Sequence, residues 1–384
     1  MKNLFYIGIA GLLLFEVANV YFIMPMPGSQ RMNSLDLAYF LYSWRWVFRA
    51  VFGLLIIGGV VPAVRRSKWG ALMALILVAG VGYAFNFQMA ADHMFYQPGS
   101  VQLKAGNQNT IKPDREILGI EVNGQAKAYP IQFIGYHHQV LDTIGGQVVM
   151  VTYCTVCRTG RVFKPVVNGK SETFRLVGMD HFNAMFEDAT TGSWWRQANG
   201  EAIAGALKGD TLPEVFSEQM TLKQWLALHP DSMVMQPDTT FNERYAKMSN
   251  YEQGKGSSDL TRMDSLSWHD KSWVVGLTVG NKANPGGTKA YDWNRLKRER
   301  LIHDTLANQP VLLVLANDNR SFFAYKRSTL SDHFILRNDT LTNGTQTYSL
   351  AGRSLSSGPN LVRLPAHQEF WHSWQTFHPG TARY

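Results

Sequence analysis

The sequence predicts a β-rich α+β protein with two pseudo-symmetric internal repeats, preceded by three transmembrane helices. Three long apolar segments lie near the N-terminus of the 384-residue chain. After them come short runs rich in Val, Ile, Phe and Tyr, separated by Asn-Gly pairs, a pattern typical of β-hairpins. A long part of this region matches a later part of the chain position by position, which predicts the repeats.

The apolar segments extend over residues 4–23, 47–64 and 69–87. Each is about long enough to cross a hydrocarbon core of roughly 30 Å as a helix. No short small-residue cleavage pattern follows the first segment, so we expect a retained helix rather than a cleaved signal peptide. The sequence therefore predicts a membrane anchor at residues 1–90 and a separate domain at residues 91–384.

Basic residues in short loops indicate the orientation, because Lys and Arg gather on the cytoplasmic side of membrane proteins. Lys2 precedes the first segment, and Arg65, Arg66 and Lys68 fill the turn between the second and third segments. These positions are expected in the cytoplasm, which places residues 88–384 on the other side of the membrane. The large domain is therefore predicted to be periplasmic or otherwise extracytoplasmic, in a compartment that permits disulfides.

An acidic residue lies inside the first apolar segment, where a charge needs a partner or a wet cavity. This residue is Glu16, and the nearest cationic candidate is Arg49, near the outer end of the second segment. A pair that locks two helices together is favoured over a role in transport or proton relay.

The composition and the motifs exclude several classes of function. The formal net charge is +8, but the basic residues are scattered and the domain is expected outside the cytoplasm. No nucleic-acid partner is therefore expected, whereas the membrane is. The chain holds no Gly-rich phosphate loop, no H-E-x-x-H and no G-x-S-x-G. We accordingly expect no nucleotide cofactor, and neither a zinc protease nor a serine hydrolase.

Two halves of the large domain align without a gap over a long stretch that begins at Lys127 and at Lys289. The matches include KAY with KAY and DT with DT, and further on TFRLVG with TYSLAG and WLALHPDS with WQTFHPGT. The repeats are predicted at about 115–235 and 274–384, joined by a polar connector at 236–273.

Two stretches of the first half are helix-like, since apolar residues recur there every three to four positions. They are residues 130–141 and 220–230. Trp225 and Trp374 occupy equivalent places in the two halves. We expect both to belong to a shared core rather than to binding platforms.

The second half also shows which residues the scaffold itself does not require. Cys154 and Cys157 fall opposite an alanine and an asparagine, and His138 falls opposite an arginine. The insertion MDHFNAMFEDATTGSWWRQAN, which the second half lacks, contains His181 and Met185. The chemically distinctive residues are thus gathered in the first half, where we expect the functional site.

The motif YCTVCRTG leaves three interpretations open. A thioredoxin-like redox centre would use a strand followed by a helix whose N-terminus lowers the pKa of the first thiol, whereas here the strand-like run RVFKPVV follows. A disulfide between Cys154 and Cys157 is sterically allowed in an oxidising compartment, but so short a loop restricts the unfolded chain little. Metal binding is favoured, because two thiolates at this spacing converge on one ion.

Further metal ligands are expected among the histidines and the methionine of the first half. The candidates for the complete site are Cys154, Cys157, His138, His137, Met185 and His181. Neighbouring histidines on a helix point to different faces, so only one of His137 and His138 is expected to bind. Sulfur combined with thioether or imidazole favours copper, whereas a tetrahedron of Cys and His alone would favour zinc.

The chain also contains the blocks KAYP, DTIGGQVVMVTYCTVCRTG, FRLVG, MFEDATTGSWWRQANGEAIAG and, at its end, FWHSWQTFHPGTARY. Together these blocks resemble the bacterial family called domain of unknown function 3179, over roughly residues 110–384. The most specific element is Tyr-Cys-x-x-Cys-x-x-Gly, which in that family reads closer to YCPLCGTG. Here Thr155, Val156 and Arg158 replace the usual residues, and Arg158 adds a positive charge that could alter the reactivity of the cysteines.

The resemblance also concerns the insertion. The family usually carries a Met-Tyr-Asp-like triplet in its later block, and Met185, Phe186 and Glu187 occupy that place here. This correspondence strengthens Met185 as a ligand candidate, while the tyrosine hydroxyl is missing. The resemblance implies the extent of the domain and the place of the site, but it supplies no reaction.

The sequence thus predicts a multi-pass protein of the bacterial inner membrane with an extracytoplasmic C-terminal domain. This domain is expected to bind a soft metal, copper before zinc, and to act in metal handling or electron transfer. The alternatives are a thiol-disulfide oxidoreductase and a non-catalytic scaffold or assembly protein with a structural disulfide. The expected partners are the membrane and a periplasmic redox or metal-donor protein. Whether the chain is an enzyme stays open at this point.

Overall fold

The computed structural model describes residues 2–256, 258–280 and 285–384, and the chain divides into two compact units. The first unit contains residues 1–96, 172–196 and 201–211, and the second contains residues 97–171, 197–200 and 212–384. Most of the insertion recognised in the first half of the domain therefore groups with the N-terminal helices.

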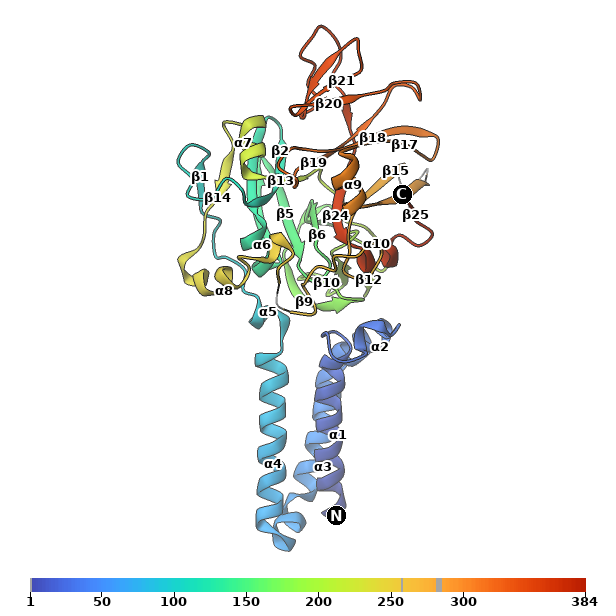
Figure 1. The fold of residues 1–384 in the computed structure, drawn as a ribbon. Helices are drawn as coiled ribbons and strands as arrows, with labels where there is room; N and C mark the ends of the chain where they lie inside the picture. Colours follow the sequence, from blue (N-terminus) through green and yellow to red (C-terminus); the bar gives the residue numbers. More distant parts are fainter. Residues whose placement is uncertain (1, 257, 281–284) are drawn as a thin grey trace. The chain divides into compact units, whose positions relative to one another are not determined.

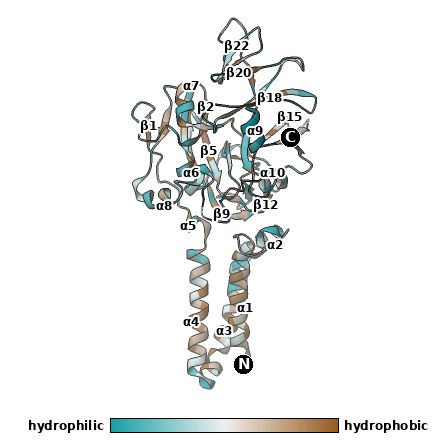
Figure 2. Ribbon diagram, in the orientation of Figure 1, coloured by the Kyte–Doolittle hydropathy of each residue, from teal (hydrophilic) through white to brown (hydrophobic). Residues whose placement is uncertain are grey.

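Three helices of the first unit coincide with the apolar segments of the sequence (Figure 1). They are α1 (Lys2–Tyr21), α3 (Arg45–Arg66) and α4 (Lys68–Tyr83), and α4 continues as the π-helical turn η2 (Ala84–Gln88). Each helix is long and apolar enough to cross a membrane, as predicted, and Figure 2 shows their predominantly hydrophobic colouring. Only 11% of the apolar window of α3 is buried inside the protein, so most of its side chains face outward, which suits lipid.

The acidic residue inside α1 has the partner that the sequence indicated. Arg49 of α3 donates two hydrogen bonds to the Glu16 carboxylate, at 2.7 and 2.9 Å. Asn86 of η2 joins this pair, since its amide nitrogen donates to Glu16 at 2.8 Å and its oxygen accepts from Arg49 at 2.5 Å. The predicted pair between helices is confirmed, and the polar network extends to the third helix.

The other elements of the first unit are short. Its remaining helices are η1 (Ser29–Arg31), α2 (Leu35–Ser43) and α5 (Ala91–Met94). Four antiparallel strands form a sheet in the order β12-β11-β10-β9. These strands are β9 (Phe174–Asp180), β10 (Asn183–Asp188), β11 (Trp194–Arg196) and β12 (Ala202–Ala204).

This sheet packs against the segment that links α1 to α2. Met179 N donates to Ile23 O at 2.7 Å, and Phe182 N donates to Gln30 Oε1 at 3.0 Å. Gly178 permits this close approach, because a Cβ atom there would lie 2.3 Å from Ile23 O. The insertion of the first half is therefore fixed to the N-terminal segment through its main chain.

In the second unit, the first half builds two sheets, ordered β1-β14-β3-β2-β13 and β4-β5-β6. Helix α6 (Ile131–His137) joins β3 to β4, and α7 (Leu222–Leu228) joins β13 to β14. The strands are β1 (Leu103–Ala105), β2 (Glu116–Val122), β3 (Gln125–Pro130), β4 (Gln139–Ile144), β5 (Gln147–Cys154), β6 (Thr159–Phe163), β13 (Glu218–Thr221) and β14 (Met233–Met235).

The second half builds sheets of closely similar order, β24-β15-β16-β25 and β17-β18-β19-β23. Helix α9 (Trp293–Glu299) joins β16 to β17, and α10 (Trp371–Phe377) joins β24 to β25. The strands are β15 (Trp273–Gly280), β16 (Pro285–Asp292), β17 (Leu301–Leu306), β18 (Gln309–Leu315), β19 (Phe322–Lys326), β23 (Val362–Arg363), β24 (Ala366–Phe370) and β25 (Ala382–Arg383). Each half shares a four-stranded order with two antiparallel pairs followed by one parallel pair, and in the first half β1 adds a further antiparallel pair with β14.

Smaller elements complete the second unit. A hairpin is formed by β7 (Val166–Val167) and β8 (Lys170–Ser171), and a three-stranded sheet by β20 (Ile335–Arg337), β21 (Thr340–Thr342) and β22 (Thr347–Ser349). The connector contains η3 (Thr239–Phe241), α8 (Asn242–Lys247) and η4 (Tyr251–Gln253).

The helix predicted at residues 130–141 ends earlier than its apolar spacing indicated. His138 has a φ of 62°, a left-handed conformation that terminates α6, and Gln139 begins β4. The apolar spacing misled the prediction because Val140, the next buried apolar residue, suits a strand as well as a helix.

The core is shared between the halves through the central strand β18. Side chains alternate between the two faces of a strand, and here both faces are buried. Val311 and Leu313 belong to a cluster made of second-half residues, whereas Leu312 and Val314 belong to a cluster that includes Ile117 of the first half. The two halves therefore depend on one continuous packing arrangement.

Trp225 and Trp374 are both buried, as predicted, with exposed fractions of 1% and 0%. Trp225 belongs to the cluster that contains Leu312 and Val314, whereas Trp374 packs in a separate cluster with Val274, Ala290 and Trp371. Each tryptophan covers a glycine of the neighbouring strand. A Cβ atom at Gly119 would lie 2.4 Å from the Trp225 ring, and one at Gly276 would lie 2.0 Å from the Trp374 ring. The glycines are required because these rings pack directly on the backbone.

Replacing Gly119 or Gly276 by Ala should therefore lower the free energy of unfolding by roughly 1–3 kcal/mol, the usual cost of overpacking a core. Denaturant unfolding of the full-length protein in detergent, followed by tryptophan fluorescence, measures this change. Gly99→Ala is the matched control, because no atom lies within 4 Å of its added Cβ. Wild-type stability of both core variants would contradict the packing described here.

Candidate functional site

The two cysteines lie on the turn of a β-hairpin. Strand β5 ends at Cys154 and pairs with β6, so that Cys154 faces Thr159 in the register. The turn closes at Arg158, whose φ of 55° is left-handed. The motif is therefore followed along the chain by a strand rather than by a helix.

Both thiols are fully buried and are not joined by a disulfide. Burial raises the pKa of the Cys157 thiol well above its ordinary value, and a hydrogen bond with Cys154 raises it further. A hydrogen bond with Ser373 and the charge of Lys271 act in the opposite direction. At neutral pH Cys157 is thus held as a protonated thiol, which is a weak nucleophile.

Residues of the connector and of the second half surround the backbone of this turn. Lys271 Nζ donates to Val156 O at 2.6 Å and to Leu260 O at 2.7 Å. His372 Nε2 lies 3.1 Å from Val156 O and 3.2 Å from Lys271 Nζ. Phe370 N donates to the carbonyl of Cys157 at 2.9 Å. The thiols therefore lie where the second half binds the first.

The groups next to the thiols differ in charge. Burial lowers the pKa of Lys271, while the thiolate forms of Cys157 and Cys154 would raise it. Burial also lowers the pKa of His372 to about 3, and the charge of Lys271 contributes, so this imidazole is neutral. Lys271 is consequently the group that can compensate a negative charge on the sulfurs.

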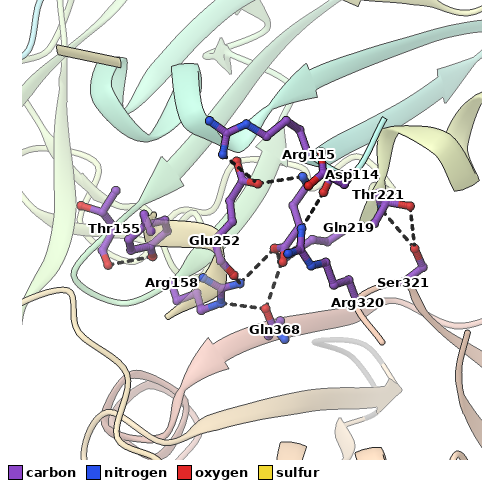
Figure 3. A network of polar contacts seen from close by, with 12 residues as sticks. Asp114, Arg115, Thr155, Arg158, Gln219, Thr221, Glu252, Arg320, Ser321 and Gln368 are labelled. Atoms are coloured by element: carbon purple, nitrogen blue, oxygen red, sulfur yellow. Dashed lines mark hydrogen bonds and ion pairs between the residues drawn. The ribbon is translucent and has the colours of Figure 1, made fainter. Parts of the chain in front are cut away.

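Arg158 is a fully buried arginine that links the turn to both halves (Figure 3). Its Nε donates to Gln368 Oε1 at 2.7 Å, and its Nη2 donates to Glu116 Oε2 at 2.9 Å. Gln219 donates to both of these acceptors, at 3.0 and 3.1 Å. The guanidinium also lies 3.7 Å from the ring centre of Trp273. The positive charge of Arg158, which follows Cys157 in the sequence, is thus paired with the carboxylate of Glu116.

Two carboxyls accompany Arg158, and burial changes their titration. Burial raises the pKa of Glu116, which the charge of Arg158 opposes. Burial, with a contribution from the Glu116 charge, raises the pKa of Glu252 from 4.5 to about 7. Glu252 accepts a hydrogen bond from Glu116 N at 3.0 Å and lies 3.5 Å from the Arg115 guanidinium. A protonated Glu252 is therefore stable in the folded protein near neutral pH.

The two predicted histidines of α6 have other polar contacts. His137 Nε2 lies 2.6 Å from Tyr245 Oη, and His138 Nδ1 lies 3.0 Å from Gly135 O. Burial lowers the pKa of His138 to about 4, so its imidazole is neutral and chemically suited to bind a metal.

The other two predicted ligands belong to the first compact unit. Met185 is fully buried in β10, opposite Gly178. His181 lies in the turn between β9 and β10, and its Nδ1 is 2.6 Å from Asp180 Oδ1. This hydrogen bond raises the pKa of His181. The six predicted residues are therefore divided, with Cys154, Cys157, His137 and His138 in the second unit and Met185 and His181 in the first.

No group of three or more His, Cys, Asp or Glu side chains is arranged to hold a metal ion within residues 2–256, 258–280 and 285–384. The sequence reasoning missed Lys271, which comes from the connector, and His372 and Ser373, which come from the second half. The block FWHSW offered a signal for two of them, because the repeat comparison sets His372 and Ser373 opposite a lysine and a glutamine.

The fold and this turn define a β-rich domain with a buried pair of thiols, preceded by helices apolar enough for a membrane. The chain belongs to the family described as "Protein of unknown function (DUF3179)", which matches residues 97–381. The resemblance noted from the sequence is confirmed, and the three long helices lie outside the match. No curated protein and no solved structure shows a significant match to the chain.

Because burial raises the pKa of Glu252, the free energy of unfolding should depend on pH. The folded protein retains a proton that the unfolded chain has lost, so stability should fall as the pH rises from 4.5 through about 7. The contribution should reach up to about 3 kcal/mol. Denaturant unfolding at a series of pH values measures it. Glu252→Gln should remove this dependence and be more stable than the wild type above neutral pH.

Glu243→Gln, at an exposed acid of α8, is the matched control and should keep the wild-type dependence on pH. An unchanged slope in the Glu252→Gln variant would contradict the assignment to Glu252.

Proposed function

We propose that Cys154 and Cys157 form the functional centre of a membrane-anchored protein and bind one copper(I) ion through their two sulfurs. The observation that carries the proposal is the contact between the sulfurs of Cys157 and Cys154 in a buried turn beside Lys271. Soft thiolate ligands select copper(I). The role would be metal handling or electron transfer outside the cytoplasm.

Charge balance supports copper(I) before zinc. Two thiolates and one copper(I) ion carry a net charge of −1, which the Lys271 ammonium compensates in a buried site. Two thiolates and one zinc ion are neutral, and zinc in structural sites takes four ligands. Among the predicted histidines, His138 contacts β5 through its main chain, because its carbonyl accepts a hydrogen bond from Tyr153 N at 3.0 Å. It is the histidine that we propose as an additional ligand.

Thiol-disulfide exchange is the second candidate. The same contact between the sulfurs is the starting arrangement for a disulfide, since the bond requires the two sulfur atoms to meet. The raised pKa of Cys157 opposes attack on a substrate, because the thiolate is the nucleophile. Forming a disulfide by exchange also requires a thiolate, so the raised pKa slows oxidation of the pair as well.

A structural role of the turn is the third candidate. Lys271 of the connector and Phe370 of the second half donate to its carbonyls, and Arg158 connects it to Gln368 of β24. The turn thus contributes to the contact between the halves whatever the sulfurs bind. A scaffold function is favoured if the protein binds no metal and its stability depends on a disulfide between Cys154 and Cys157.

We also infer that the two halves arose by internal duplication. The corresponding strand orders support this, as do matched side-chain contacts. Lys127 contacts Asp142 at 2.9 Å, and Lys289 contacts Asp304 at 2.6 Å. Similar losses of stability in the Gly119→Ala and Gly276→Ala variants are expected from a duplication, and a large effect in only one half would count against it.

For the copper proposal, full-length protein in detergent should bind one copper(I) ion per chain under reducing conditions, measured by competition with a chromogenic chelator. The Cys154→Ala/Cys157→Ser double variant should bind none. Lys271→Met should weaken binding by roughly tenfold or more, because it removes the compensating charge. Lys289→Met, which alters an ion pair of the second half, is the matched control and should bind as the wild type does.

The double variant also separates the candidates. Loss of buried sulfur packing should cost on the order of 1–3 kcal/mol. A native disulfide would add about 2–5 kcal/mol to that cost. Copper binding no stronger in the wild type than in the double variant would sink the copper proposal. A wild type that contains an intact disulfide and a double variant that unfolds would favour the scaffold.

We propose a multi-pass topology because basic residues lie at the turn between α3 and α4 and at Lys2, positions that are therefore expected in the cytoplasm. A reporter active only outside the cytoplasm, fused after Tyr96, should be active, and a reporter active only in the cytoplasm should be silent. A fusion after Ser67 should give the reverse result. Cytoplasmic activity after Tyr96 would refute the assignment and make an oxidised thiol pair unexpected.

A further inference from the structure

A polar cavity of about 180 Å³ lies in the first unit, at one end of the three long helices. It is lined by the C-terminal end of α1, the N-terminal end of α3, the turn η2 and strand β9. These helix ends mark the boundary between hydrocarbon and water if the helices cross a membrane. The cavity is therefore placed where polar lipid headgroups lie, whichever side of the membrane it faces.

Arg45 provides a positive charge at this cavity. Its Nη1 donates to Tyr42 O at 2.7 Å, and its guanidinium lies 3.9 Å from the centre of the Tyr42 ring. The other two arginines nearby have carboxylate partners at 2.7 Å, Arg49 with Glu16 and Arg175 with Glu187. Within the described part of the chain, no carboxylate forms an ion pair with Arg45. The Arg45 guanidinium can therefore donate charge-assisted hydrogen bonds to a bound anion.

Asn19 supplies the second, independent observation. This residue lines the cavity with an exposed fraction of 6%, and its side-chain oxygen has no hydrogen-bond partner in the described part of the chain. A buried acceptor without a donor is costly, so the position favours a bound group with an N–H or O–H. A group that satisfies both Arg45 and Asn19 carries an anion and a donor on the same small molecule.

We propose that this cavity binds the headgroup of one membrane phospholipid. The phosphate diester would accept hydrogen bonds from Arg45, and the hydroxyl or ammonium group beyond it would donate to Asn19 Oδ1. The acyl chains would follow the outer face of α3, where Val47, Val51 and Leu54 are exposed at helical spacing. Phospholipid headgroups combine these features with an apolar tail, whereas inorganic phosphate has no tail to occupy that face.

The test uses full-length protein, exchanged into lipid-free detergent and then mixed with phosphatidylglycerol, phosphatidylethanolamine or inorganic phosphate. Native mass spectrometry counts the bound molecules and gives their affinity. The wild type should bind one phospholipid with preference over further copies. Arg45→Ala should weaken this first binding by about tenfold, because it removes a charge-assisted hydrogen bond. Asn19→Leu should weaken it less, and Arg45→Lys should restore part of it.

Arg66→Ala is the matched control, because Arg66 is an exposed arginine at the opposite end of the same helix. It should bind the phospholipid as the wild type does. Equal binding by the Arg45→Ala and wild-type proteins would overturn the proposal, as would displacement of the phospholipid by equimolar inorganic phosphate. If Arg45→Ala does not fold, unchanged binding in both Asn19→Leu and Arg45→Lys would overturn it instead.

Discussion

The buried guanidinium of Arg158 is the interaction on which the second unit depends. A charge with no exposure is costly unless it is paired and hydrogen-bonded, and here Glu116 pairs with Nη2 while Gln368 accepts from Nε. Glu116 lies on β2 and Gln368 on β24, so one side chain of the turn connects the sheets of both halves. The left-handed backbone of Arg158 is tolerated because these contacts hold it.

The burial that stabilises this junction also determines what the cysteines can do. Excluding water raises the pKa of Cys157, which makes the thiol a poor nucleophile at neutral pH. Lys271, from the connector, is a nearby cation that favours negative charge on the Cys157 sulfur. The same burial thus disfavours rapid thiol exchange.

The sequence was most informative where local periodicity or self-similarity carries the information. The apolar helices, the Glu16 and Arg49 pair, the buried tryptophans and the strand that follows the cysteines could all be predicted. The neighbours of the thiols could not, because Lys271 and His372 are far from Cys154 along the chain. Their contact depends on the packing of one half against the other, which periodicity does not encode. The end of α6 was also missed, since it depends on the left-handed backbone of a single residue.

The insertion shows a further limit of local reasoning. His181 and Phe182 form the two-residue turn between β9 and β10 with φ values of 48° and 68°, where Asn-Gly is the usual choice. A left-handed backbone costs roughly 1–2 kcal/mol for each residue that has a side chain. Gln30 accepts a hydrogen bond from Phe182 N, and Asn33 lies 3.1 Å from His181 Nε2, so the linker between α1 and α2 stabilises the turn. The N-terminal segment is therefore part of this folded unit, because it supplies contacts that offset a strain present in the insertion.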